Sequence, residues 1–190
     1  GGTVDMFERM AAGDIRACWI ICTNPVASVA NRSTVIDALR RADLVVVQDV
    51  YGDTETTEYA DIVLPAAMWS ETHGVMVNSE RSVTLCRPAA PPPGEALPDW
   101  RIIAEIAGGL GFGEHFAYDD AEAVFDEIRR FHNPRTGWDL RGISYAGLAD
   151  GPVQWPCPPD DPQRRHPVRY VAADGGRPTF PTPSGRARFL

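Results

Sequence analysis

The chain has 190 residues, of which 44% are hydrophobic and 23% are charged, and its formal net charge is −8. These values are typical of a globular protein with one domain of ordinary size and a core large enough to fold. The acidic excess argues against nucleic acid and against a membrane as partners, although a local loop can still bind an anion. No apolar run approaches the roughly 20 residues of a membrane-spanning helix.

Both ends of the sequence lack the features of a natural terminus. Gly1 stands where an initiator Met would be, and no signal-peptide pattern follows it. The other end stops at Leu190 in the middle of a pattern. We therefore expect an internal fragment of a longer protein, which would be inactive by itself.

The four cysteines do not form a C-x-x-C pair, so their spacing supports neither a zinc nor an iron–sulfur site within the chain. Two of them lie in an apolar run, where buried free thiols are common. We expect reduced, structural thiols, which fits a cytoplasmic protein. No residue pattern indicates a catalytic nucleophile. The four positions are Cys18, Cys22, Cys86 and Cys157.

The first half of the sequence alternates between helical and strand-like patterns. Helical spacing predicts one helix over 3–12 and another from the cap Asn31 to about Arg41. Alternation of this kind predicts an α/β fold with a parallel sheet flanked by helices. Three short apolar runs are expected to be strands, namely residues 17–22, 44–47 and 61–64. The first is expected to be covered on both faces, and the second to be buried.

The pattern changes after Pro65. Residues 75–85 alternate as in a strand or a hairpin, and residues 88–98 hold five prolines and predict an extended segment. A helix is expected over 99–110, and another over about 120–131 with Asp119 as its cap.

Pro and Gly are frequent from residue 133 onward, and periodicity is poor, which predicts an irregular, wrapping C-terminal extension. We expect an α/β domain over 1–113. The remaining residues, 114–190, would supply a helix and the wrapping segment, which would lead to a further C-terminal domain.

Polar residues follow the predicted strands. Thr23 and Asn24 come after the first strand, and Gln48 and Asp49 end the second. In a parallel α/β sheet, ligands bind beyond the carboxyl ends of the strands, so these side chains are expected along one edge. Asn24 offers an amide and Thr23 a hydroxyl to a heteroaromatic ring or a phosphate.

Asp49 and Asp99 offer carboxylates. A carboxylate accepts two hydrogen bonds side by side, which matches the adjacent N1–H and 2-amino donors of a guanine base. The alternative is structural, because an Asp after a strand is often a helix cap and Asp99 is well placed to cap the helix near Trp100. Residue chemistry alone leaves both interpretations open.

Five segments of the sequence carry motifs of one family in the right order. They are WIICTNP at 19–25, VVVQD at 45–49, ADIVLPAAMWSE at 60–71, GVMVNSER at 74–81 and PGEALPDW at 93–100. Together these segments resemble the molybdopterin oxidoreductase family over residues 1–113. Any one of them could arise by chance, whereas the ordered set is highly specific.

This resemblance implies a cofactor of one molybdenum held by two molybdopterin guanine dinucleotides, with a [4Fe–4S] cluster near the start of the whole protein. Motif by motif, Asn24, Gln48, Asp49 and Asp99 fall where the family contacts one dinucleotide. Many relatives carry Lys directly after the Trp-x-Glu, where this chain has Thr72, whose hydroxyl would keep a weaker contact. With Thr23 included, these six residues are the expected cofactor-binding set. The resemblance identifies no metal ligand and no catalytic side chain in this chain.

The later segments resemble assimilatory nitrate reductases, and formate dehydrogenase catalytic subunits share much of the pattern. The matching stretches are 139–145, 151–158 and 180–189. The resemblance implies reduction of nitrate, a small anion, to nitrite by oxygen-atom transfer at molybdenum. It also implies an electron donor, namely ferredoxin, flavodoxin or an NADH-linked flavin subunit.

Two other interpretations stay open. The chain could be a molybdopterin-like scaffold retained without molybdenum in an electron-transfer complex, although such relatives usually lose the loop residues. It could also be a small α/β nucleotide-binding module, which its ends and its Pro-rich tail argue against.

Overall fold

The computed structural model describes residues 2–160, 176, 178, 180 and 182–189. The chain divides into two compact units, and each is described by itself. Unit 1 comprises Gly1–Thr72 and Arg87–Tyr118, and unit 2 comprises His73–Cys86 and Asp119–Leu190. The predicted division near residue 113 falls close to the end of unit 1, while residues 73–86 group with the later part of the chain.

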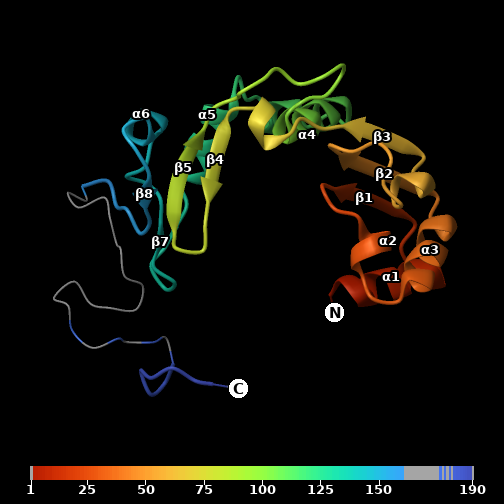
Figure 1. The fold of residues 1–190 in the computed structure, drawn as a ribbon, viewed down its shortest axis with the longest axis horizontal. Helices are drawn as coiled ribbons and strands as arrows, with labels where there is room; N and C mark the ends of the chain where they lie inside the picture. The colour runs from red at the N-terminus through yellow and green to blue at the C-terminus, as the bar shows by residue number, and fades with distance from the viewer. Residues whose placement is uncertain (1, 161–175, 177, 179, 181, 190) are drawn as a thin grey trace. The chain divides into compact units, whose positions relative to one another are not determined.

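Unit 1 is built on a three-stranded parallel sheet in the order β1-β2-β3, as the apolar runs predicted (Figure 1). Its strands are β1 (Ala17–Ile21), β2 (Leu44–Asp49) and β3 (Ile62–Pro65). The register pairs Ile21 with Gln48, and Gln48 with Leu64. The carboxyl ends of the strands therefore meet at one edge, where their loops can share a ligand.

Two helices cover one face of this sheet. They are α1 (Thr3–Ala12), which ends at the left-handed Gly13, and α3 (Arg32–Arg41). Their apolar sides pack on Ile20, Val45 and Val47 and form the core of the unit. Both helices confirm the prediction from the spacing of apolar residues. The short helix α2 (Pro25–Ser28) was not predicted, because four residues are too few to show a helical period.

Much of the opposite face of the sheet is exposed within the described residues, although Gln48, which lies on it, is fully buried. The prediction of cover on both faces was wrong for the exposed part. Trp19, Ile21 and Leu44 are 37–40% exposed, and Ile62 is 46% exposed. They share this face because strand side chains alternate. A continuous apolar run indicates that both faces are apolar, but it does not say what packs on the second one.

Unit 1 continues with the helix α4 (Asp99–Gly109), close to the predicted range. Three short 3-10 helices lie in its connections, namely η1 (Thr57–Tyr59), η2 (Trp69–Glu71) and η3 (Gly113–His115). Among the described residues, no helix combines the length and the apolar character that crossing a membrane requires.

Unit 2 begins with the predicted hairpin, β4 (Gly74–Val77) and β5 (Ser82–Cys86), which is antiparallel. The helix α5 (Ala121–Ile128) ends three residues earlier than predicted. Its cap is Asp120, whose carboxylate accepts from the N–H of Ala123, so the prediction of Asp119 as the cap was wrong by one residue.

Residues 132–154 are more ordered than their Pro and Gly content predicted. They form the strands β6 (His132–Asn133), β7 (Trp138–Asp139) and β8 (Val153–Gln154) and the short helix α6 (Tyr145–Leu148). β8 pairs with β5. Two-residue strands and a one-turn helix are too short to produce a period, which is why the sequence did not reveal them. The predicted wrapping segment lies largely in residues 161–190, most of which are outside the described part.

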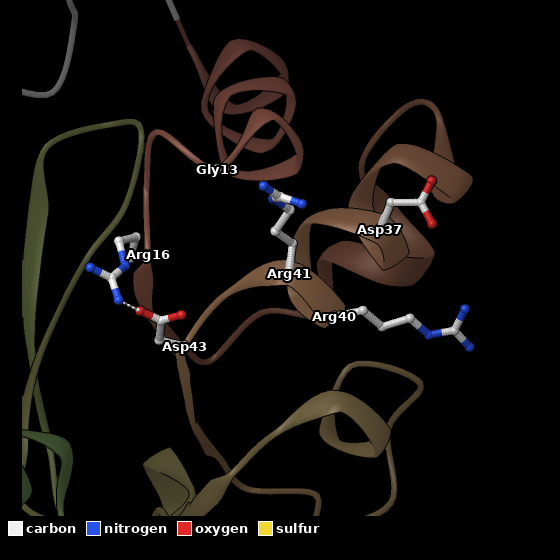
Figure 2. A pocket seen from close by; sticks show the side chains of 6 residues that line it. All are labelled: Gly13, Arg16, Asp37, Arg40, Arg41 and Asp43. Carbon is white, nitrogen blue, oxygen red and sulfur yellow. Dashed lines mark ion pairs between the residues drawn. The ribbon is translucent and has the colours of Figure 1, made fainter.

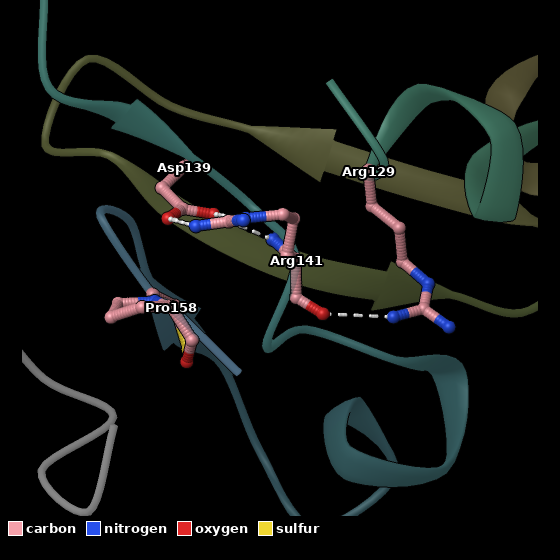
Figure 3. Close-up of polar contacts among 5 residues, drawn as sticks. Arg129, Asp139, Arg141 and Pro158 are labelled. Carbon is pink, nitrogen blue, oxygen red and sulfur yellow. Dashed lines mark hydrogen bonds and ion pairs between the residues drawn. The ribbon is translucent and has the colours of Figure 1, made fainter. Parts of the chain in front are cut away.

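A polar cluster anchors the segment after β7, as Figure 3 shows. The guanidinium of Arg141 donates to both carboxylate oxygens of Asp139, at 3.0 and 2.8 Å. Arg129 donates to the carbonyl oxygen of Arg141 at 2.9 Å. The hydrogen bonds from the Arg141 side chain are the main cause that lowers the pKa of the Asp139 carboxyl below its usual value. Asp139 and Arg141 flank the core residue Leu140, and the core residue Ile143 follows them.

The close approach at Gly142 gives the first prediction. A Cβ there would lie 2.3 Å from the carbonyl oxygen of Pro158 and 2.9 Å from that of Cys157. We expect Gly142→Ala to lower the free energy of unfolding of unit 2 by about 1–3 kcal/mol, because backbone must move. Hydrogen exchange of the β5 amides measures it. Gly74→Ala is the control, since nothing lies within 4 Å of a Cβ there, and equal effects of the two would contradict the prediction.

Candidate functional site

The carboxyl edge of the sheet collects most of the candidate residues. Beyond β3, Ala66 forms a parallel bridge with Leu97, and the N–H of Ala67 donates to the carbonyl oxygen of Leu97 at 2.8 Å. This bridge brings the start of α4 to the edge where β1 and β2 end. Asp99, the first residue of α4, therefore joins residues that precede it by more than 50 positions.

The central contact is between Gln48 and Asp99. The carboxamide of Gln48 donates from Nε2 to Oδ1 of Asp99 at 2.5 Å. Gln48 is fully buried, and within the described residues its Oε1 has no hydrogen-bond partner. Oδ2 of Asp99 likewise has no partner among the described residues. The edge thus presents a buried amide oxygen and a carboxylate oxygen that can accept further hydrogen bonds.

The alternative role of Asp99 as a helix cap is not the one observed. The cap position of α4 is Pro98, and Asp99 is the first helical residue. Its carboxylate accepts from Gln48 and from the thiol of Cys22 at 3.4 Å. The negative charge in the first turn still suits the helix dipole. Asp99 is therefore aimed at the sheet edge.

The carboxylate of Asp49 stabilises the turn that follows β2. Its Oδ1 accepts from the N–H of Tyr51 at 3.0 Å, an Asx turn that directs the chain out of β2. Its backbone oxygen accepts from Ala66 at 3.0 Å, and the residue is 9% exposed. The structure places Asp49 next to Gln48 with one carboxylate oxygen committed to the backbone.

Asn24 is held by two residues that the sequence analysis missed. Its Nδ2 donates to Oε2 of Glu55 at 2.6 Å, and its Oδ1 accepts from the hydroxyl of Thr56 at 2.6 Å. The Thr56 oxygen also accepts from the N–H of Val26 at 3.2 Å, so it caps α2 in place of Asn24. The bond from Asn24 is the main reason that the pKa of Glu55 is lowered. The polar run after β2 was the one signal for these residues.

Thr23 and Thr72 are the two remaining candidates. Thr23 lines a cavity of about 580 Å³ beside β1, together with Trp19 and Pro25. Thr72 follows η2 as its C-terminal cap with extended backbone. The carboxylate of Glu71, one residue earlier, accepts from the N–H of Met68 at 2.9 Å and closes that turn. A cofactor contact at Thr23 or Thr72 stays a prediction.

A second cavity, of about 500 Å³, lies at the opposite end of the strands (Figure 2). Arg16 forms an ion pair with Asp43, while Arg40 and Arg41 point in different directions. The guanidinium of Arg41 lies over Gly13. The cations do not converge on one point, and they lie where parallel strands begin, so the carboxyl edge remains the better candidate site.

Comparison with known proteins bears on what binds at that edge. The model of the family described as molybdopterin oxidoreductase matches residues 1–108. The chain belongs to the molybdopterin oxidoreductase family. This result confirms the family resemblance seen in the five ordered motifs, and the family as such supports a molybdenum–pterin cofactor.

Relatives within the family include nitrate reductases and a formate dehydrogenase. The chain is 43% identical to the nitrate reductase of Synechocystis sp. over 97% of its own length and 26% of the relative. It is 41% identical to the assimilatory nitrate reductase catalytic subunit of Bacillus subtilis, covering 83% of the chain and 22% of the relative. The same three values apply to the F420-dependent formate dehydrogenase subunit alpha of Methanocaldococcus jannaschii. The chain thus spans about a quarter of the length of these molybdopterin oxidoreductases.

A solved structure supports the fold of this molybdopterin oxidoreductase segment. Acetylene hydratase from Pelobacter acetylenicus superposes with a TM-score of 0.61 and 24% identity, over 78% of this chain and 20% of that one. At this level of identity the likeness concerns the fold alone. It agrees with the mixed α/β architecture and the parallel three-stranded sheet.

Thr56 gives a prediction for the Asn24 network. We expect Thr56→Val to lower the free energy of unfolding of unit 1 by about 1–3 kcal/mol, because the buried N–H of Val26 and Oδ1 of Asn24 lose their partner. Hydrogen exchange of the β2 amides measures this change. Thr57→Val is the control, since its hydroxyl bonds only within its own turn. An equal loss of unfolding free energy in both variants would show that the bonds of Thr56 to Val26 and Asn24 contribute no more than the turn itself.

Proposed function

We propose that this chain is the segment of a molybdenum-dependent oxidoreductase that binds one guanine dinucleotide of a bis(molybdopterin guanine dinucleotide) cofactor. The enzyme reduces nitrate to nitrite by oxygen-atom transfer. One observation carries the binding role, namely the partly buried contact between Gln48 and Asp99, which leaves Oδ2 of Asp99 and Oε1 of Gln48 as acceptors. The similarity to nitrate reductases over almost the whole chain supports the reaction.

The acceptors suit the group they would hold. The Watson–Crick edge of guanine carries two adjacent N–H donors, and a carboxylate binds such a pair side by side. The carboxylate of Asp99, held at the end of a parallel sheet, is therefore complementary to guanine. Asp99 would bind the base, and Gln48 would hold Asp99 in place.

The bound molybdenum supplies the redox chemistry, and the protein supplies binding and orientation. The residues of this edge fix one end of a long cofactor, so they orient the far end where the small anion reacts. The rest of the proposal concerns the whole protein: a [4Fe–4S] cluster, a cytoplasmic location, and electrons from ferredoxin, flavodoxin or an NADH-linked flavin subunit.

A formate dehydrogenase is the second candidate, because a relative of that name is 41% identical over 83% of the chain. The protein expressed from its complete reading frame separates the two. We expect nitrate-dependent oxidation of reduced methyl viologen, and no reduction of oxidised viologen by formate. Formate-dependent reduction without nitrate activity would replace the reaction proposed here. Absence of molybdenum and of both activities would favour a non-catalytic scaffold.

Asp99 gives the test of the site itself. In the same whole protein, we expect Asp99→Ala to weaken binding of the guanine dinucleotide by about tenfold or more, since a hydrogen bond to a charged group contributes roughly 1.5–3 kcal/mol. The measurements are molybdenum content and the GMP released on acid hydrolysis, per mole of protein. Asp53→Ala, an exposed carboxylate of the same unit, is the control. Unchanged GMP in the Asp99 variant would refute the assignment.

A further inference from the structure

Cys22 differs from the buried structural thiol that its apolar surroundings predicted. It is exposed, and it follows β1 with a φ of 51°, in the left-handed region. Its N–H donates to the carbonyl oxygen of Gln48 at 2.7 Å, which continues the pairing of β1 and β2 by one residue. Its Sγ lies 3.4 Å from Oδ1 of Asp99 as a donor. The backbone thus brings the thiol to the acceptor of the proposed site.

Oδ1 of Asp99 is fully engaged by this arrangement. A carboxylate oxygen has two lone pairs, and those of Oδ1 face Nε2 of Gln48 and the thiol of Cys22. A ligand that binds side by side needs one lone pair on each carboxylate oxygen. One of the two donors on Oδ1 must therefore leave. The thiol is the weaker donor, so it leaves more easily than the carboxamide.

The second acceptor of the site, Oε1 of Gln48, has no donor within the described residues. Gln48 is fully buried, its carboxamide is directed at Asp99, and its Oε1 has no hydrogen-bond partner among the described residues. A buried acceptor without a donor destabilises a protein, because it has lost its hydrogen bonds to water without replacement. A ligand that brings N–H groups to this point would remove that penalty, and it would do so beside the thiol.

We propose that Cys22 is a positioning residue of the site, whose thiol occupies the place on Asp99 that a ligand N–H takes when the guanine dinucleotide binds. The proposal rests on the proposed function. In the empty protein the thiol fixes the orientation of the carboxylate. On binding, the ligand replaces the S–H donor, and Asp99 keeps its bond to Gln48.

The titration of the thiol agrees with this geometry. Burial, and then the charge and the hydrogen bond of Asp99, raise the pKa of Cys22 to about 11. The group therefore stays protonated near neutral pH and can donate. Cys18 lies within β1, the strand that Cys22 follows, and burial alone raises the pKa of its thiol. Cys18 is thus a matched control without a carboxylate partner.

Variants at position 22 separate positioning from packing. The probe is GDP, titrated calorimetrically into the whole protein without cofactor, with ADP as the control nucleotide. A hydroxyl is a stronger donor than a thiol, so we expect Cys22→Ser to bind GDP roughly two- to tenfold more weakly than the wild type, the range of one net hydrogen bond. Cys22→Ala frees the position and should bind at least as tightly as the wild type. A packing role predicts the reverse order, since Ser resembles Cys more closely.

The S–H stretching band in the infrared gives the direct readout, because hydrogen bonding lowers its frequency. Difference spectra against Cys22→Ala isolate the band of this thiol, and Cys18→Ala gives the reference. We expect the Cys22 band to rise in frequency when GDP or the cofactor binds, and also in Asp99→Ala, while the Cys18 band stays in place.

The outcomes separate the two proposals. Suppose that the wild type, Cys22→Ser and Cys22→Ala bind GDP equally and that the S–H band of Cys22 does not move. The inference about Cys22 is then wrong, and the dinucleotide site stands. If neither GDP nor the cofactor binds, while molybdenum and GMP are absent from the loaded preparation, the proposed function is wrong. Tighter binding by Cys22→Ser than by Cys22→Ala would also overturn the inference.

Discussion

The hydrogen bond from Gln48 to Asp99 joins the centre of the sheet to the helix that follows it. Gln48 is the only polar residue of β2 before its last position, and it is fully buried. Burial of a carboxamide is costly where its polar atoms lack partners, and Asp99 supplies the partner of Nε2. The bridge between Ala66 and Leu97 delivers that partner. The contact between Gln48 and Asp99 thus depends on the pairing of Ala66 with Leu97 as well as on the two residues themselves.

The edge contains two kinds of polar side chain. Asn24 has both ends of its amide engaged, by Glu55 and Thr56, and so it mainly fixes the loop after β1. Asp99 keeps an oxygen without a partner among the described residues. A ligand reaches Asp99 by displacing a weak thiol donor, whereas at Asn24 it must break bonds of 2.6 Å. The side-chain chemistry of Asn24 and Asp99 suggested that both bind the cofactor. Their contacts indicate that Asn24 mainly holds its loop, whereas Asp99 can accept a ligand.

The sequence was sufficient for the scaffold, because short apolar runs between helical periods fix both the strand type and the edge where strands end. It was not sufficient for contacts over long separations. Thr56 lies 32 residues after Asn24, and Asp99 lies 51 after Gln48. No local period reports such pairs. The exposure of Cys22 depends on a left-handed φ, which an apolar run does not reveal.

The charges at this edge favour one end of a nucleotide over the other. Three acidic side chains gather at this edge. Asp49 ends β2, Glu55 lies in the loop after β2, and Asp99 is brought there as the first residue of α4. A phosphate brought to this edge would be repelled, whereas a base edge with N–H donors would be attracted. The overall excess of acidic residues strengthens this preference. The carboxyl edge of this molybdopterin oxidoreductase segment therefore suits the base of a dinucleotide, and the phosphates must extend away from Asp99 toward groups that are less acidic.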